Sequence, residues 1–203
     1  MSRKLIIVFE GIEGTGKSHH INNVAKYLKK NNKEFIRIRE PGGSKNSEKI
    51  RKLILNNKST FNEYTDLLLY LSARSENIEL IKKNIGKKII LIDRFSDSTI
   101  AYQHYGMGVN LKFIKNINDF LLKDINIDFT FLNTVSKKKM KSRLIKRKKL
   151  NRYDKFNNIF YDRVQKGFLK ILKKNPKKYL KINSNLSIDY NEKIILNKIN
   201  DLI

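Results

Sequence analysis

The sequence predicts an α/β fold in which buried parallel strands alternate with helices. Short apolar runs rich in β-branched residues recur along the chain, with longer mixed segments between them. Such runs are typical of parallel strands, because crossover helices cover both faces of a parallel sheet. The intervening segments carry the spacing of amphipathic helices. The alternation of the two kinds of segment therefore favours right-handed strand–helix–strand units.

Five expected strands follow one another along the chain: Leu5–Phe9, Phe35–Ile38, Lys88–Ile92, Phe129–Leu132 and Tyr179–Ile182. Helical spacing is clearest in two of the segments between them. The apolar positions are Leu67, Leu71, Ile78, Ile81 and Ile85 in one, and Phe160, Val164, Phe168 and Leu172 in the other. Only the basic stretch Lys137–Lys149 departs from the average composition, and it indicates a helix end or a mobile flap.

The length of 203 residues predicts a single domain, 1–203. The chain has no cysteine, which excludes a disulfide framework and a thiolate metal site. The apolar run Leu5–Phe9 is too short for the core of a signal peptide, and no run reaches the length of a membrane span. We therefore expect a cytoplasmic protein without a membrane partner.

The formal net charge of +25 suggests nucleic-acid binding, because a basic surface attracts phosphate backbones. The lysines are, however, spread along the whole chain together with many Asn and Ile residues. This distribution favours a solvated basic surface over a binding footprint, so we expect no specific nucleic-acid partner. A nucleic-acid-binding protein remains the alternative that the charge alone supports.

The segment after the first expected strand carries a phosphate-binding motif. The pattern of Gly, four residues, Gly, Lys and then Ser or Thr is matched by Gly11-Ile12-Glu13-Gly14-Thr15-Gly16-Lys17-Ser18. Its glycines allow backbone N–H groups to curl around phosphate oxygens, and the helix that begins near Lys17 directs its positive end at the same anion. We expect Lys17 to contact the β- and γ-phosphates of ATP, and Ser18 to coordinate Mg²⁺. A simple glycine turn would need neither the lysine nor the hydroxyl.

A carboxylate suited to the same metal ends the third expected strand. Asp93 stands at the carboxyl edge of the sheet, where open α/β folds bind their ligands, and can hold magnesium directly or through water. Arg94 follows it and would supply positive charge to a phosphoryl group in transfer. A guanine-reading Asn-Lys-x-Asp tetrad is absent from the sequence, which disfavours a GTPase and leaves a small-molecule kinase.

Three motifs in order make the sequence resemble the bacterial thymidylate kinase family. They are Phe9-Glu10-Gly11-Ile12-Glu13-Gly14, Arg39-Glu40-Pro41-Gly42-Gly43 and the run Asp93-Arg94-Phe95-Ser96-Asp97-Ser98-Thr99-Ile100-Ala101-Tyr102-Gln103. The resemblance extends from Leu5 to about Phe168. It implies a three-layer fold of the P-loop NTPase type, with a five-stranded parallel sheet flanked by helices. It also implies magnesium-assisted phosphoryl transfer from ATP to dTMP, and a homodimer.

The resemblance also implies the residues of the acceptor site. Arg39 and Pro41 would border the monophosphate, and Arg94 would hold it. Tyr70 would stack on thymine and Arg74 would bind the base edge and the phosphate, although Tyr70 fits a core stripe equally well by periodicity. Ser98 and Gln103 would face the base and Tyr102 the 2′ position of the sugar, while Glu13 would orient a cation or the acceptor.

The basic stretch resembles a lid over ATP, at about 141–154. Arg143 would contact ATP, and a lid arginine would stabilise the phosphoryl group in transfer. Gly14 places the chain in the bacterial subtype that supplies this arginine from the lid rather than from the loop. Arg147 and Arg152 are both candidates, because Asn151 and Asn133 depart from the family pattern. Another nucleoside-monophosphate kinase remains an alternative. His19 and His20 are interpreted as helix surface beside the loop.

Overall fold

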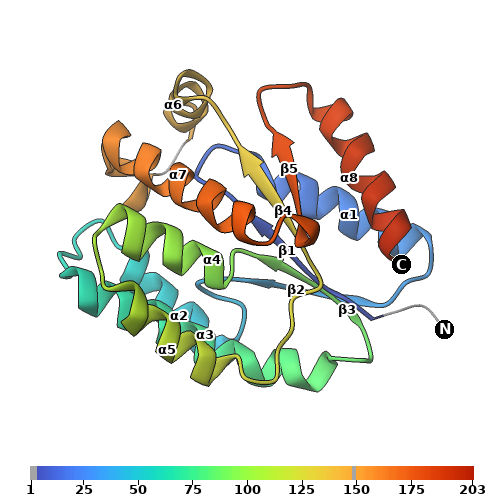
Figure 1. The fold of residues 1–203 in the computed structure, drawn as a ribbon, viewed down its shortest axis with the longest axis horizontal. Helices are drawn as coiled ribbons and strands as arrows, with labels where there is room; N and C mark the ends of the chain where they lie inside the picture. Colours follow the sequence, from blue (N-terminus) through green and yellow to red (C-terminus); the bar gives the residue numbers. More distant parts are fainter. Residues whose placement is uncertain (1–3, 148–149) are drawn as a thin grey trace.

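The computed structural model describes residues 4–147 and 150–203 and contains a five-stranded parallel sheet flanked by helices (Figure 1). The strands lie in the order β2-β3-β1-β4-β5, which confirms the expected fold class. Their bounds are β1 Ile6–Glu10, β2 Phe35–Arg39, β3 Ile89–Asp93, β4 Phe129–Thr134 and β5 Tyr179–Asn183. Each strand thus ends one or two residues later than the apolar runs indicate.

Both faces of the sheet are apolar because neighbouring residues of each strand point to opposite sides. On one face, Ile7 and Phe9 of β1 pack against helices α1 and α8. On the other face, Ile6 and Val8 pack against helix α3. Buried apolar area of this kind contributes roughly 25 cal/mol per Å² to stability. Figure 1 shows α1 and α8 on one side of the sheet and α2 to α5 and α7 on the other.

The helices take up the segments between the strands. Within residues 4–147 and 150–203, eight helices are α-helical: α1 Lys17–Lys30, α2 Lys45–Leu55, α3 Glu63–Asn84, α4 Ser96–Thr99, α5 Leu111–Leu121, α6 Lys137–Ile145, α7 Asn158–Lys174 and α8 Ile188–Leu202. A π-helical turn, η1 Ile100–Gly106, continues α4, and two 3₁₀ turns are η2 Tyr153–Lys155 and η3 Pro176–Lys178. Among the described residues, no helix has the length and apolarity needed to cross a membrane.

The starts of the helices differ in a way that bears on ligand binding. Helices α2, α3 and α7 begin after Ser44, Asn62 and Asn157, whose side chains accept hydrogen bonds from first-turn N–H groups. Helix α1 begins after Gly16 instead, in the left-handed region at φ 85°. Glycine has no side chain to cap the helix, so the first N–H groups of α1 are left for another acceptor.

Candidate active site

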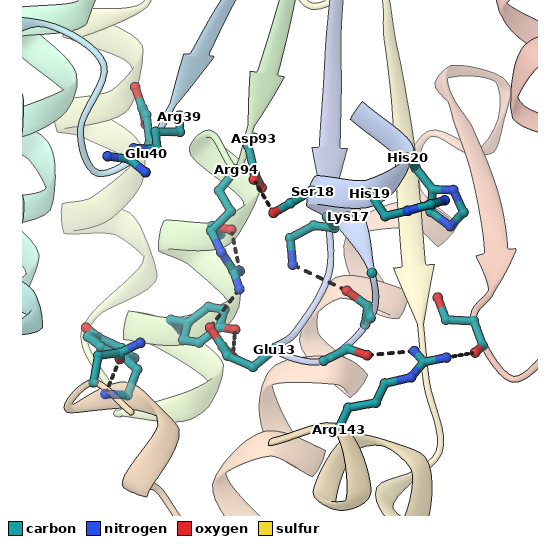
Figure 2. A pocket seen from close by; sticks show the side chains of 18 of the residues that line it. Glu13, Lys17, Ser18, His19, His20, Arg39, Glu40, Asp93, Arg94 and Arg143 are labelled. Atoms are coloured by element: carbon teal, nitrogen blue, oxygen red, sulfur yellow. Dashed lines mark hydrogen bonds and ion pairs between the residues drawn. The ribbon is translucent and has the colours of Figure 1, made fainter. Parts of the chain in front are cut away.

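A cavity of about 490 Å³ opens at the carboxyl edge of the sheet, where β1, β2 and β3 end. Figure 2 shows charged side chains from several elements pointing into it. Most of the predicted site residues line this cavity: Glu13, Gly14, Thr15, Gly16, Lys17, Ser18, Arg39, Pro41, Tyr70, Asp93, Arg94, Ser98, Tyr102, Gln103, Arg143 and Arg147. The predicted residues that are not among its lining are Gly11, Ile12, Arg74 and Arg152.

The loop between β1 and α1 surrounds the Lys17 ammonium. Lys17 Nζ donates to the carbonyl oxygens of Gly11 at 2.7 Å and Ile12 at 2.9 Å. Gly11 and Ile12 thus reach the site through their backbone. Burial, together with the charge of Arg94, lowers the pKa of Lys17 to about 8. The ammonium therefore lies next to the loop that leads into α1. The uncapped N–H groups at the start of this helix suit phosphate oxygens.

Ser18 and Asp93 meet across the loop. The Ser18 hydroxyl donates to Asp93 Oδ2 at 3.3 Å, although the two residues are 75 positions apart in the chain (Figure 2). Parallel pairing of β1 with β3 sets Phe9 opposite Asp93, so the carboxylate and the start of α1 lie at one edge. A hydroxyl and a carboxylate this close form a donor set that fits Mg²⁺, which keeps its other positions for water and phosphate oxygens.

Arg94 lies between the phosphate loop and the π-helical turn η1. Its guanidinium donates to Glu13 Oε1 at 2.7 Å and to the Gly11 carbonyl at 2.8 Å. The Tyr102 hydroxyl donates to the other Glu13 oxygen at 2.5 Å. Burial alone would raise the pKa of Glu13, but the charges of Arg94 and Lys17 lower it below its usual value. Glu13 therefore orients Arg94 at the centre of the cavity.

The backbone at Arg94 is held in an uncommon conformation by Glu10. Arg94 has φ 66°, in the left-handed region that non-glycine residues rarely adopt. The buried Glu10 carboxylate accepts from the N–H groups of Phe95 at 2.8 Å and Ser98 at 3.1 Å, and from the Ser98 hydroxyl. Burial and the charge of Asp97 raise the pKa of Glu10 to about 7. Glu10 belongs to the first motif, but this role could not be predicted from the motif alone.

The loop after β2 is shaped by two glycines. Gly42 and Gly43 have φ 116° and 107°, and a Cβ at Gly42 would lie 2.5 Å from Glu48 Oε1. The same Glu48 binds the Arg39 guanidinium through both of its oxygens. This contact holds Arg39 at the rim of the cavity, with 55% of its side chain exposed. The loop therefore places Arg39 and Pro41 at the rim.

Arg74 lies behind the wall of the cavity. Its guanidinium donates to Glu40 at 2.8 Å, Asn118 at 2.6 Å and Thr99 at 2.9 Å, and its side chain is 1% exposed. Arg74 thus contacts Glu40, Asn118 and Thr99 and is not among the residues that line the cavity, and its direct contact with a nucleotide stays a prediction. Tyr70, four residues earlier, does line the cavity, although it also packs against Tyr153.

The two candidate lid arginines point to different places. Arg147 lines the cavity and pairs with Asp154 at 2.6 Å. Arg152 pairs with the buried Asp66 and lines a separate pocket with Phe61 and Arg163. Spacing along the chain could not distinguish them. Lys148 and Lys149, which the sequence interpretation placed in the lid, lie outside the described residues.

Arg143 joins the phosphate loop to the segment after β5. It donates to the Gly14 carbonyl at 2.7 Å and to the Ser184 carbonyl at 3.0 Å (Figure 2). Beyond it, the cavity continues along His20, Ser184 and Asn191. His20 is only 4% exposed, so its interpretation as helix surface was wrong. Ser184 directly follows β5 and Asn191 lies on α8, a part of the chain in which the sequence carries no motif.

Sequence reasoning also missed Arg51 and Tyr153, which line the cavity. Arg51 on α2 donates to the Pro41 carbonyl, and it follows Ser47, which binds Gly42, by four residues. Helical spacing from Ser47 could have indicated that Arg51 faces the same loop. Tyr153 offered no comparable signal, because its position depends on contacts with η1 and α3.

Comparison with known proteins agrees with this geometry. Residues 9–195 match the family model described as thymidylate kinase. The thymidylate kinase of Thermosipho africanus (strain TCF52B) is 39% identical over 171 residues, with 83% of this chain and 85% of that protein aligned. The thymidylate kinase of Mycoplasma capricolum subsp. capricolum (strain California kid) is 35% identical, with 97% of each chain aligned.

A solved structure extends the similarity to the whole fold. The crystal structure of thymidylate kinase from Ehrlichia chaffeensis superimposes with a TM-score of 0.79 at 30% identity. The alignment covers 98% of this chain and 99% of that one, so sheet, helices and site edge have counterparts throughout. With the match of the family model to residues 9–195, these similarities establish that the chain belongs to the thymidylate kinase family.

Proposed function

We propose that this protein phosphorylates dTMP to dTDP at the expense of ATP, in the supply of dTTP for DNA synthesis. One observation carries the proposal. A phosphate-binding loop, several arginines and the side chains proposed to contact the base all line the same cavity. Arg94 lies between the two halves and contacts both the loop, through the Gly11 carbonyl, and helix α4, through the Ser98 hydroxyl at 3.4 Å. A phosphoryl group in transfer would pass this guanidinium.

On the donor side, the loop 11–18 and Lys17 bind the ATP phosphates. The N–H groups at the start of α1 and the Lys17 ammonium supply positive charge there. Arg143 links the loop to the segment after β5, so it holds together the two walls between which the nucleoside of ATP lies. His20 lines the cavity near this end.

Ser18 and Asp93 would hold magnesium, since they place a hydroxyl and a carboxylate together at the phosphate loop. When bound, Mg²⁺ neutralises charge on the phosphate oxygens. The protein's own part is to fix these two ligands and to keep Lys17 beside them. In the resting geometry the Ser18 hydroxyl donates to Asp93, so each ligand holds the other in place.

On the acceptor side, Arg39 and Arg94 bind the dTMP phosphate, and Pro41 borders it. Tyr70 stacks on the base, Ser98 and Gln103 face its polar edge, and Tyr102 lies at the 2′ position of the sugar. Arg74 acts indirectly, because its ion pair with Glu40 fixes the loop that precedes Pro41. The buried Glu40 carboxylate would otherwise be left uncompensated.

Arg147 is the lid arginine, because it lines the cavity whereas Arg152 does not. The acceptor phosphate is already ionised, so the transfer needs no strong general base. Positioning of the two nucleotides in line, and neutralisation of charge by Lys17, Arg94 and Arg147, supply the rate enhancement. Glu13 contributes by orienting Arg94.

The decisive experiment measures ADP release from ATP and magnesium with dTMP, dUMP, dCMP, UMP or AMP as the sole acceptor. We expect dTMP to be the best acceptor, and Arg94→Ala to lower kcat/KM for dTMP by about 10²-fold or more. Arg37→Ala is the matched control, because Arg37 is exposed on β2 and does not line the cavity. Equal activity with AMP, or none with dTMP, would refute the assignment.

We also propose that the protein acts in the cytoplasm as a homodimer. Leu53 of α2, Tyr64 and Leu68 of α3, and Phe113 of α5 are apolar side chains that are 39–52% exposed. Tyr64 and Phe113 pack edge to face at 6.0 Å, so exposed apolar side chains of α3 and α5 lie side by side. Sedimentation velocity at micromolar concentration tests the proposal, since a single monomeric species would contradict it.

A further inference from the structure

Asp66 joins three parts of the site although it does not line the main cavity. It lies on α3 with 0% exposure, four residues before Tyr70. One carboxylate oxygen pairs with Arg152, at the base of the lid. The other accepts from the Tyr153 hydroxyl and from Gln103 Nε2, the latter at 3.1 Å. A buried carboxylate with three partners is therefore in direct contact with the side chain proposed to read the base.

The contacts of Gln103 fix which end of its amide faces the cavity. Gln103 Nε2 carries two hydrogens, and its two acceptors are Asp66 at 3.1 Å and the Tyr153 hydroxyl at 3.2 Å. The Tyr153 hydroxyl donates to Asp66 Oδ2, so both acceptors lie on the same side of Nε2 and hold the amide with this nitrogen toward Asp66. Gln103 lines the cavity with 1% exposure, so the carbonyl Oε1 is the group that it can offer to a ligand.

The opposite orientation of the amide is disfavoured by charge. An ionised carboxylate only accepts hydrogen bonds. In the flipped orientation, the carbonyl oxygen of Gln103 would face the carboxylate oxygen of Asp66, and two acceptors repel each other. The Arg152 guanidinium pairs with the same carboxylate, which leaves Asp66 as an acceptor only. Burial also raises the pKa of Tyr153 well above its usual value, so its hydroxyl stays protonated and donates to Asp66.

We propose that Asp66 is a positioning residue that sets the pyrimidine specificity of the site by holding Gln103 with its carbonyl oxygen toward the base. The proposal deepens the proposed function and rests on it. Thymine and uracil carry a hydrogen on N3, which Gln103 Oε1 accepts. Cytosine carries a lone pair on N3 instead, and this lone pair repels the Gln103 carbonyl oxygen. A site built around one such hydrogen bond rejects an analogue that cannot form it.

A purely structural role for Asp66 predicts a different result from a specificity role. If Asp66 only stabilised the fold, its loss would lower activity toward every acceptor in the same proportion. If it orients Gln103, its loss changes the ratio between acceptors. Asp66→Asn separates the two, because the introduced amide can donate to Gln103 Oε1 and so permit the flipped orientation that suits cytosine.

The experiment compares kcat/KM for dTMP and dCMP, with ATP and magnesium saturating. We expect Asp66→Asn to lower the dTMP-to-dCMP ratio by about tenfold or more, with dCMP activity kept or raised while dTMP activity falls. Glu79→Gln is the matched control, since it makes the same change from acid to amide at an exposed position of the same helix. We expect its ratio to equal that of the wild type.

Tyr153→Phe provides a second, milder test, because it removes one acceptor of Gln103 Nε2 and leaves the Asp66–Arg152 ion pair intact. We expect the ratio to fall about threefold. Thermal melting by circular dichroism identifies the folded variants, and if Asp66→Asn does not fold, Tyr153→Phe decides. An unchanged ratio in a folded variant overturns the proposal. Failure of the wild type to use dTMP would refute the proposed function instead.

Discussion

At the scale of single residues, Lys17 gives the site a dependence on pH. Its pKa is lowered to about 8 by burial and by Arg94, so the ammonium loses its proton as the pH rises through 8. The phosphates of ATP require the charged form. We therefore expect KM for ATP to rise as the pH increases from 7.5 to 9, by up to roughly eightfold if binding follows the protonated fraction. Initial rates at saturating dTMP measure this.

Lys17→Arg is the matched variant for this prediction, because arginine stays charged throughout the same range. We expect lower activity from the variant, since a guanidinium fork does not reproduce the contacts of Nζ with Gly11 and Ile12. Its KM for ATP should nevertheless be independent of pH. The same rise in both proteins would assign the titration to another group.

The motifs predicted those site residues whose positions follow directly from their distance along the chain to the end of a strand. Ser18 and Asp93 meet because each stands at a fixed offset from the end of a parallel strand. His20, two residues beyond Ser18, was misplaced, because its burial depends on the β5–α8 segment, which lacks a motif. The role of Asp66 could not be predicted either, because it also depends on distant parts of the chain. Its partners lie 37, 86 and 87 positions away, and nothing in local spacing brings them together.

At the scale of elements, close packing of α7 on η1 positions two of the residues proposed to face dTMP. Gly167 of α7 faces Tyr105 of η1, and a Cβ at Gly167 would lie 2.5 Å from its ring. We expect Gly167→Ala to destabilise the protein by up to about 2 kcal/mol, since overpacking costs about 1–3 kcal/mol and the better helix propensity of alanine returns about 1 kcal/mol. KM for dTMP should rise, because η1 carries Tyr102 and Gln103.

Urea unfolding measures the stability of this variant. Lys166→Ala is the control, because Lys166 is the exposed neighbour on α7, and we expect its effect to stay within about 0.5 kcal/mol. A net gain in stability from Gly167→Ala would show that Tyr105 moves aside at little cost. Helix propensity would then dominate over packing at this position.

The number of strands was predictable, but their ends were not. Apolar runs identified all five strands, because both sheet faces are covered and even the edge strands β2 and β5 keep apolar residues at alternate positions. The runs stop before Glu10, Arg39 and Asp93, which the structure includes in β1, β2 and β3. Ladder pairing extends these strands by one residue, for example Arg39 opposite Asp93. The residues added by pairing are the charged ones that reach the site.

At the scale of the whole molecule, the charge of +25 acts on stability as well as on ligand attraction. Like charges spread over a compact surface repel one another and destabilise the folded state. Several exposed ion pairs oppose this repulsion locally, among them Arg39–Glu48 and Lys137–Asp162. Exposed pairs of this kind contribute only about 0–1 kcal/mol each, so we expect the net repulsion to dominate.

Salt should therefore stabilise the protein. The Debye length falls from about 30 Å at 0.01 M to about 10 Å at 0.1 M, which screens repulsion between distant lysines more than attraction within a contact pair. We expect Tm to rise by roughly 2–8 °C between 10 and 200 mM NaCl, since about 1 kcal/mol shifts the Tm of a chain this long by about 2–4 °C. Differential scanning calorimetry measures the rise.

The control distinguishes screening over the whole surface from binding of an anion in the phosphate loop. Lys17→Ala removes the ammonium that would hold a chloride ion there, so an unchanged rise in the variant points to screening. A rise that disappears in Lys17→Ala would instead assign the stabilisation to the loop. A Tm that falls with salt would mean that the exposed ion pairs outweigh the net charge, because screening then removes more attraction than repulsion.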